Sequence, residues 1–478
     1  MSKKTRQRRL RRLEEPRGVD LAVQAGMTKS EIGMVLAIGL AFCLAVAVEL
    51  GGTTPEGTLQ LTHWTPWRDL GILQTSAILF GPFPLIAWVL WRSEKDSPLS
   101  PSPLVALLVF ASLALQALSM LADPRGLHLV QQIAASPGAT SYFSDAVRIR
   151  SLAEWLQHFH EIPLGYHSVT HPPGPIVFYF VFFKLFGPSA GATLGGWAIG
   201  LLGSAGVAVM YAFAGLWTID RRAQLTASAF YALIPALTLF FPEFDQVYPV
   251  LSMLLVFFWV KAVGASAVKP ALGAGVVLFL ATFFAYNLLA LGVFLAYYGL
   301  HWLWRAQNTR PAWRSLFRTS GMVLGVYAGL YAVLRVATGY NPFAALHRAV
   351  ATQAVFAANL HRAYGPFVLL DLYDFFLGAG ILAFPILLFH LRRQFRQWNV
   401  RRHDLALTLI GLATILTLDL SGLLRGETAR VWLFLQPLLI VPVALELARV
   451  PWRWKLSIFA LQWWILACLK AKMTFLNP

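Results

Sequence analysis

Long apolar runs separated by short polar segments dominate the hydrophobic pattern of this 478-residue chain. Most of these runs approach or exceed the roughly 18–20 residues that an α-helix needs to cross a bilayer. The pattern predicts spans at about 32–50, 71–91, 104–121, 191–217, 223–241, 247–264, 271–302, 320–337, 371–390, 404–420, 431–448 and 457–470. Because 271–302 is too long for one helix, it predicts two short helices with a break near "AYN", residues 285–287. We therefore expect an all-α polytopic membrane protein with about thirteen transmembrane helices.

The distribution of Lys and Arg predicts the orientation of these spans, because cytoplasmic loops of membrane proteins are enriched in both residues. With the N-terminus inside and the spans alternating, 27 of the 39 Lys and Arg fall on inner segments. We expect a basic cytoplasmic tail at 1–30 and N-terminal transmembrane helices at 31–121. A large non-cytoplasmic loop at 122–190 with interfacial helices follows, and the remaining transmembrane bundle occupies 191–478.

Composition narrows the class of protein further. The chain is 57% hydrophobic and only 13% charged, whereas a soluble domain carries about 25% charged residues. The net charge of +17 follows from the basic inner segments, so it does not call for a nucleic-acid partner. Cys43 and Cys468 each lie inside an expected span, where apolar packing is their ordinary role. We expect a multi-pass protein of the cytoplasmic membrane with its N-terminus in the cytoplasm.

Ionisable residues gather on the segments expected outside, first in the large loop. "YFSDAVRIRSLAEWL" carries Asp145 and Arg148, and Asp145 is either a helix-start carboxylate or a catalytic group. "THPPGP", residues 170–175, contains His171 and forms a rigid turn into an expected interfacial helix at 173–189. The spacing of the four nearby histidines matches no strong metal motif, which favours hydrogen bonding over metal ligation.

Two short outer loops carry the other polar clusters. "FPEFDQVYP" holds Glu243 and Asp245, either as a simple polar turn or as part of an acidic cleft. "SGLLRGETARVWLFLQP" holds Arg425, Glu427 and Arg430, although arginine on the outer side opposes the orientation bias. These arginines therefore either form interfacial ion pairs with Glu427 or bind a phosphate. No phosphate-binding glycine loop or dinucleotide fingerprint accompanies them.

In their order and shared side of the membrane, these stretches resemble the GT-C glycosyltransferase superfamily. The nearest branch comprises the protein O-mannosyltransferases, aminoarabinose transferase and related bacterial membrane mannosyltransferases. The resemblance rests on Asp145 followed by "HPPGPIVFYFVFFKLFG", on "PEFDQ" in the next outer loop, and on "GYNPFAALHRAVATQ" and "RGETARVWLFLQP". It covers residues of about 120–450. The chain departs from the family in having two spans, rather than one, before the helix that leads into the large loop.

The resemblance implies an enzyme that transfers a sugar from a polyprenyl-phosphate donor to a lipid, glycan or protein acceptor, with inversion. Asp145 would be the general base. Glu243 and Asp245 would hold the acceptor, support the base, or bind a divalent cation through oxygen ligands. The candidate substrate-binding residues are Arg148, His171, Arg425, Glu427 and Arg430, with the arginines stabilising the leaving phosphate.

A multi-span transporter or lipid flippase is the alternative function. Such a protein needs ionisable residues near the bilayer centre. The candidates here lie near the ends of the expected spans: Glu49, Asp371, Asp374, Asp419 and Glu446. This placement favours an enzyme working at the membrane surface.

Overall fold

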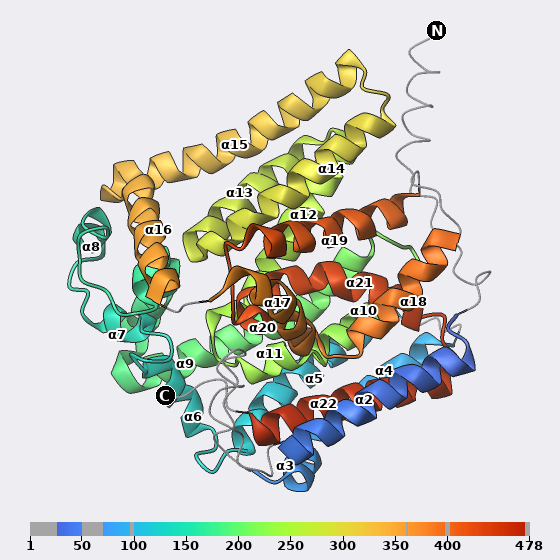
Figure 1. Cartoon of the computed structure of the whole chain (residues 1–478). Helices are drawn as coiled ribbons and strands as arrows, with labels where there is room; N and C mark the ends of the chain where they lie inside the picture. Colours follow the sequence, from blue (N-terminus) through green and yellow to red (C-terminus); the bar gives the residue numbers. More distant parts are fainter. Residues whose placement is uncertain (1–25, 50–69, 96–99, 360–361, 397–401, 474–478) are drawn as a thin grey trace.

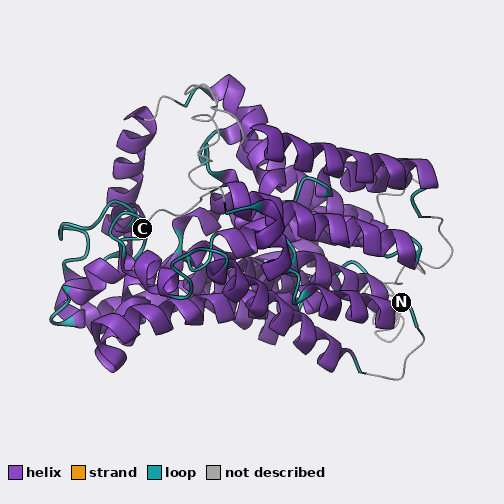
Figure 2. Ribbon diagram, turned by 90° about the horizontal axis from the view of Figure 1, so that it is seen from below, coloured by secondary structure: helices purple, strands orange, loops and turns teal. Residues whose placement is uncertain are grey.

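The computed structural model describes residues 26–49, 70–95, 100–359, 362–396 and 402–473, and every regular element in these ranges is helical (Figure 1; Figure 2). The first half contains α2 (Lys29–Glu49), α3 (Ile72–Leu79), α4 (Phe83–Ser93), α5 (Pro101–Leu121), α6 (His128–Ala135), α7 (Tyr142–Val147), α8 (Leu152–Gln157), η3 (Ser168–Thr170), α9 (Gly174–Ala214), α10 (Arg221–Ala232), α11 (Pro235–Leu239) and η4 (Phe244–Gln246). The second half contains α12 (Tyr248–Ala265), α13 (Val268–Phe284), η5 (Tyr286–Ala290), α14 (Leu291–Arg305), α15 (Arg310–Thr338), α16 (Pro342–Asn359), α17 (Tyr364–Ala379), α18 (Ala383–Arg396), α19 (His403–Ser421), α20 (Thr428–Val431), η6 (Leu433–Leu435), α21 (Gln436–Leu447) and α22 (Trp452–Lys472).

Six helices of the described chain are long and apolar enough to cross a membrane, and two bent pairs raise the number to as many as eight. The bent pairs are α3 with α4, at 53°, and α17 with α18, at 100°. Other expected spans are shorter: α13 has 17 residues, and the chain at 223–241 divides between α10 and α11, which begins at Pro235. The structure therefore supports an all-α membrane-embedded protein, while a count of about thirteen spans is not confirmed.

The expected break near residues 285–287 is present. Helix α13 ends at Phe284, Ala285 is extended with φ −157°, and η5 leads into α14. Both α13 and α14 pack against α12, and α15 packs against α13. The predicted pair of short helices thus forms one wall of the bundle, with α15 at its edge (Figure 1).

Helix α9 folds back on itself where the sequence predicted separate interfacial and spanning helices. Gly187, with φ 76° and ψ −175°, breaks the helical geometry just before Pro188. A Cβ at Gly191 would lie 2.8 Å from the Phe182 carbonyl oxygen, and one at Gly195 would lie 2.7 Å from the Tyr179 ring. The first part of α9 therefore packs directly against the second part.

The segment that carries Glu243 packs against a stripe of glycines on the second part of α9. A Cβ at Gly200 would come within 2.5 Å of the Phe241 ring, and one at Gly203 would lie 3.1 Å from the Gln246 side chain. Small residues let backbones approach closely where helices pack in a membrane. The glycine stripe thus brings the short loop after α11 into contact with α9.

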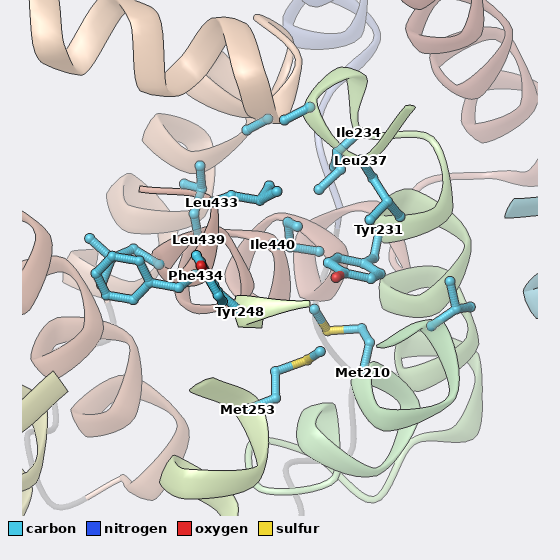
Figure 3. Packing of buried hydrophobic residues seen from close by; sticks show 14 of the residues in the cluster. Met210, Tyr231, Ile234, Leu237, Tyr248, Met253, Leu433, Phe434, Leu439 and Ile440 are labelled. Atoms are coloured by element: carbon cyan, nitrogen blue, oxygen red, sulfur yellow. The ribbon is translucent and has the colours of Figure 1, made fainter. Parts of the chain in front are cut away.

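The core beneath this loop is apolar and continuous. In Figure 3, Met210 of α9, Tyr231 of α10, Met253 of α12 and Ile440 of α21 converge, and all four are fully buried. Helices α10 and α21 also pack directly on each other. This packing joins the N-terminal and C-terminal halves of the chain beneath the polar loops.

Four polar segments meet at one end of the bundle, which we call the loop end: residues 122–173, residues 242–247, residues 339–359 with 362–363, and residues 422–432. Helix α16 contacts η3, and η4 contacts η6, which directly follows the last segment. The Tyr142 ring meets the Phe244 ring, and Arg362 pairs with Glu427. Tyr166 stacks on Phe356, with ring centroids 4.6 Å apart. Segments predicted to share one face of the membrane are therefore neighbours in space.

The positive φ of Gly187 in α9 predicts that a side chain at this position lowers stability, although there is room for it. Gly187→Ala should lower the melting temperature of the detergent-purified protein, because this backbone region is essentially restricted to glycine and costs other residues about 1–3 kcal/mol. The matched control is Gly329→Ala inside α15. Neither added Cβ would meet an atom within 4 Å, so equal melting temperatures for the two variants would contradict the conformational explanation.

Candidate functional site

Arg430 lies at the centre of the charged groups at the loop end. Its Nη1 donates to Oε2 of Glu243 at 2.8 Å, and its Nη2 donates to Oε2 of Glu427 at 2.5 Å. The side chain of Glu243 is 3% exposed and that of Arg430 is 17% exposed. Charge-assisted hydrogen bonds of this kind are strong when water is largely excluded. The pair joins η4 to α20 across 187 residues of sequence.

Helix α17 anchors the loop that presents Arg430. The Gly426 amide donates to Oδ1 of Asp371 at 2.7 Å, and the Ala429 amide donates to Oδ2 of Asp374 at 2.9 Å. The Thr428 hydroxyl donates to the Asp371 carbonyl at 2.5 Å. These two buried aspartates, which the sequence places near the end of a span, bind backbone amides that would otherwise lack a partner.

Arg425 and Arg362 brace the same loop from either side. Arg425 donates to the carbonyl oxygens of Gly422, at 3.0 Å, and of Arg362, at 2.7 Å. Arg362 returns a hydrogen bond to the Arg425 carbonyl, and its Nη2 lies 3.5 Å from Oε1 of Glu427. Arg425 therefore binds backbone, while Arg362, a residue that no sequence motif singled out, faces the same carboxylate as Arg430.

The carboxyl groups around Arg430 outnumber this one guanidinium group, because Glu243 and Asp245 both act on it. Together with Glu427, three carboxyl groups act electrostatically on this single guanidinium. Burial raises the pKa of Glu243, Asp245 adds to the effect, and Arg430 opposes it. Oε1 of Glu243 has no hydrogen-bond partner among the described residues. The pair can therefore share a proton, accept a hydrogen bond from a hydroxyl group, or attract a cation.

Two histidines of the large loop interact electrostatically with Arg430, and their neutral form is favoured. Burial is the first cause that lowers the pKa of His167 and of His171 to about 4, and Arg430 contributes to both shifts. His171 Nδ1 lies 2.8 Å from the His167 carbonyl oxygen, so that nitrogen carries the proton and donates it. The Tyr142 ring meets the His171 ring edge to face, with centroids 5.5 Å apart.

Asp145 is tied to the large loop and, among the described residues, forms no hydrogen bond with Glu243 or Asp245. Its Oδ2 accepts a 2.9 Å hydrogen bond from the Gly165 amide, and its Oδ1 lies 3.6 Å from Arg148 Nη1. The Asp145 side chain is 3% exposed, whereas Arg148 is 74% exposed. Asp145 sits one turn beyond Tyr142 on α7, and the loop it binds leads directly to the two histidines. The structure thus connects Asp145 to the cluster through that loop.

The candidate residues therefore fall into three sets. Glu243, Glu427 and Arg430 form one ion-pair network, with Asp245 and His171 coupled to it electrostatically. The other predicted residues, Asp145, Arg148 and Arg425, bind elsewhere around it. Among the described residues, no three His, Cys, Asp or Glu side chains form a group that could hold a metal ion. A divalent cation at Glu243 and Asp245 stays a prediction.

Comparison with known proteins assigns no family or function to this chain. No model of a known protein family matches the chain, and no curated protein matches it either.

The neutral state of His171 predicts how stability depends on pH. Between pH 6.5, the ordinary pKa, and about 4, the unfolded chain binds a proton that the folded chain does not. The stabilisation is therefore complete above pH 6.5 and is lost as the pH falls through this window. Melting temperatures measured from pH 7 to 4 should fall more steeply in the wild type than in His171→Gln. His347→Gln, at an exposed position of α16, should follow the wild type, and parallel profiles for all three proteins would contradict the prediction.

Proposed function

We propose that this protein is an integral-membrane glycosyltransferase that uses a polyprenyl-phosphate sugar donor. The observation that supports this function best is the ion pair of Arg430 with the buried Glu243 at the loop end of an apolar helical bundle. A guanidinium there can bind a phosphate at headgroup level, while the adjoining carboxyl groups can bind and activate a hydroxyl group. The GT-C resemblance of the sequence supports the same class.

The proposed reaction is a single displacement at the anomeric carbon. The acceptor oxygen forms a bond to that carbon as the bond to the donor phosphate breaks, so the configuration inverts. The acceptor proton passes to the carboxylate of Asp145, and the bond electrons leave with the lipid phosphate. Arg430 stabilises the charge that develops on this phosphate. No nucleotide is required, because the lipid phosphate serves as the leaving group.

The other candidates take supporting roles in the proposal. Glu243 and Asp245 orient the acceptor hydroxyl or bind a divalent cation, and neutral His171 offers its remaining nitrogen as a hydrogen-bond acceptor. Arg425 shapes the loop through its bonds to carbonyl oxygens. Arg148 is exposed beside Asp145, where it can guide an anionic donor. The acceptor is a lipid, a glycan or a protein.

A transporter or flippase remains the second candidate, because charged groups are also buried away from the loop end. Glu446, at the end of α21, is fully buried against Arg393 at 2.5 Å and Arg449 at 3.4 Å. Lys455, at the start of α22, is fully buried and pairs with Glu94. These groups lie at helix ends and are paired, as expected for ion pairs that hold neighbouring helices together. A transport path would call for groups that exchange partners during the cycle.

The proposed site requires the loop end to face away from the cytoplasm. In a chain whose buried native cysteines, Cys43 and Cys468, are replaced, Gly138→Cys should react with a membrane-impermeant maleimide in intact cells or spheroplasts. Thr309→Cys, between α14 and α15, should react only after the membrane is permeabilised. The reverse labelling pattern would place the loop end in the cytoplasm and remove the proposed donor from reach.

Asp145→Asn should lower sugar transfer by roughly 10²–10⁴-fold, the usual contribution of a general base. Asparagine keeps an oxygen that can accept from the Gly165 amide, so folding should change little. The assay uses purified protein with radiolabelled polyprenyl-phosphate sugars and a membrane lipid extract. Asp123→Asn is the matched control, because Asp123 is equally buried but pairs with Arg125 in the same loop. Full transfer by Asp145→Asn would exclude Asp145 as the base.

A further inference from the structure

We propose that the Glu427 carboxylate occupies the place of a lipid phosphate group between Arg430 and Arg362 and leaves when that phosphate binds. The inference rests on the proposed function and deepens it in two ways. It adds Arg362 as the second phosphate-binding arginine, and it gives Glu427 the role of a displaceable internal anion. Glu427 is then a positioning residue that keeps both guanidinium groups in place while the site is empty of donor.

The geometry of the two ion pairs points to this arrangement. The two oxygens of Glu427 face different guanidinium groups: Oε2 lies 2.5 Å from Arg430 Nη2, and Oε1 lies 3.5 Å from Arg362 Nη2. Two oxygens of one phosphate can make the same pair of contacts. The phosphodiester of a polyprenyl-phosphate sugar has two non-bridging oxygens for these contacts, and guanidinium binds phosphate with the same planar fork that it presents to carboxylate.

Each arginine is fixed by a bond that does not involve Glu427. Arg430 is held by Glu243 through its other terminal nitrogen, and Arg362 is held by the Arg425 carbonyl. Both guanidinium groups are mostly covered, with exposed fractions of 17% and 13%, whereas Glu427 is 34% exposed. Glu427 is therefore the member of the cluster that can move into water while the arginines stay in place.

Hydrogen bonds from α17 hold the backbone around Glu427. Glu427 precedes α20 at the position where a side chain often caps the helix, yet its carboxylate accepts no capping hydrogen bond. Its φ of 55° and ψ of 29° lie in the left-handed region, which is unusual for a residue other than glycine. The amides of this loop bind Asp371 and Asp374 instead. Rotation of the Glu427 side chain would break its ion pairs with Arg430 and Arg362 and leave the amide bonds to Asp371 and Asp374 in place.

Apolar residues beside the site indicate that the phosphate belongs to a lipid. Leu420 and Leu423 are 59% and 74% exposed, and Tyr364 is about half exposed. The Tyr364 hydroxyl donates to the Leu420 carbonyl, which fixes the ring against the loop of Arg430. A phosphate carried on an isoprenoid chain could bind the arginines while its tail covers these side chains. Leu420 lies near the end of α19, a helix long enough to cross the membrane, so such a tail would reach the arginines from the bilayer.

Binding of farnesyl phosphate to the full-length protein in phosphatidylcholine nanodiscs tests the inference. Removing the competing carboxylate by Glu427→Gln should tighten binding by about tenfold, whereas Arg362→Lys should weaken it by a similar factor because lysine lacks the planar fork. Glu161→Gln is the control, because that glutamate is 63% exposed and pairs with His158 and His160 of the large loop. It should bind as the wild type does. Melting temperatures confirm that each variant is folded.

The outcomes separate the inference from its alternatives. The proposed displacement of Glu427 would be overturned if Glu427→Gln bound farnesyl phosphate as weakly as the wild type or more weakly. It would also be overturned if neither the wild type nor Glu427→Gln bound farnesyl phosphate. Equal affinities for inorganic phosphate and farnesyl phosphate would overturn the lipid assignment, and equal affinities for phosphatidylglycerol and farnesyl phosphate would overturn the assignment to an isoprenoid carrier. Sugar transfer by the wild type is measured separately. If the wild type transfers sugar but Glu427→Gln does not tighten farnesyl phosphate binding, the proposed function stands and the displacement of Glu427 is wrong. If Glu427→Gln tightens binding but the wild type transfers no sugar, the phosphate site stands and the proposed function is wrong.

Discussion

The loop end depends on one buried ion pair, Arg430 with Glu243. Each partner belongs to a segment that is held by a neighbouring helix. The Glu243 loop packs on the glycine stripe of α9, and the amides of the Arg430 loop donate hydrogen bonds to Asp371 and Asp374 of α17. The pair joins these two supports. Removing one partner would leave the other buried and unpaired, a defect that typically costs about 3–5 kcal/mol. The arrangement of the other charged groups follows, because Asp245, Glu427 and His171 all interact with the same guanidinium.

The hydrophobic pattern alone predicted much of the fold. It located the apolar helical segments and the break at Ala285, because helix length and apolar composition are local properties. It did not predict that α9 folds back at Gly187, because an apolar stretch looks the same whether it lies along the membrane surface or packs on the next helix. The number of spans was equally hard to predict. Helices such as α10 are short, interrupted and packed on other helices, so composition does not tell whether they cross the bilayer.

For the candidate site, residue types were easier to predict than partners. Acids and arginines on segments expected outside identified Glu243, Glu427 and Arg430, which do form one network. The local ion pair of Glu427 with Arg430 was one of the predicted alternatives, whereas the pairing of Glu243 with Arg430 across 187 residues left no local signal. Arg362 was missed because it lies in no motif, and Asp371 was read as a residue near the end of a span although it binds a loop amide. Sidedness and chemistry remain proposals, since neither follows from helix packing.

The same sequence separation has a consequence for biosynthesis. Glu243 leaves the ribosome 187 residues before Arg430, and at about 5–20 residues per second this delay is roughly 10–40 s. During that time the acid must enter or border the membrane without its counterion, so protonation is the cheapest way to tolerate the apolar surroundings. Arrival of Arg430 then gives the carboxyl group its hydrogen-bond partner, opposes the rise of its pKa and completes the loop end in one late step. A nascent chain that stalls before α20 would carry an acidic group with no cation to match it, a feature that membrane quality-control proteases could recognise.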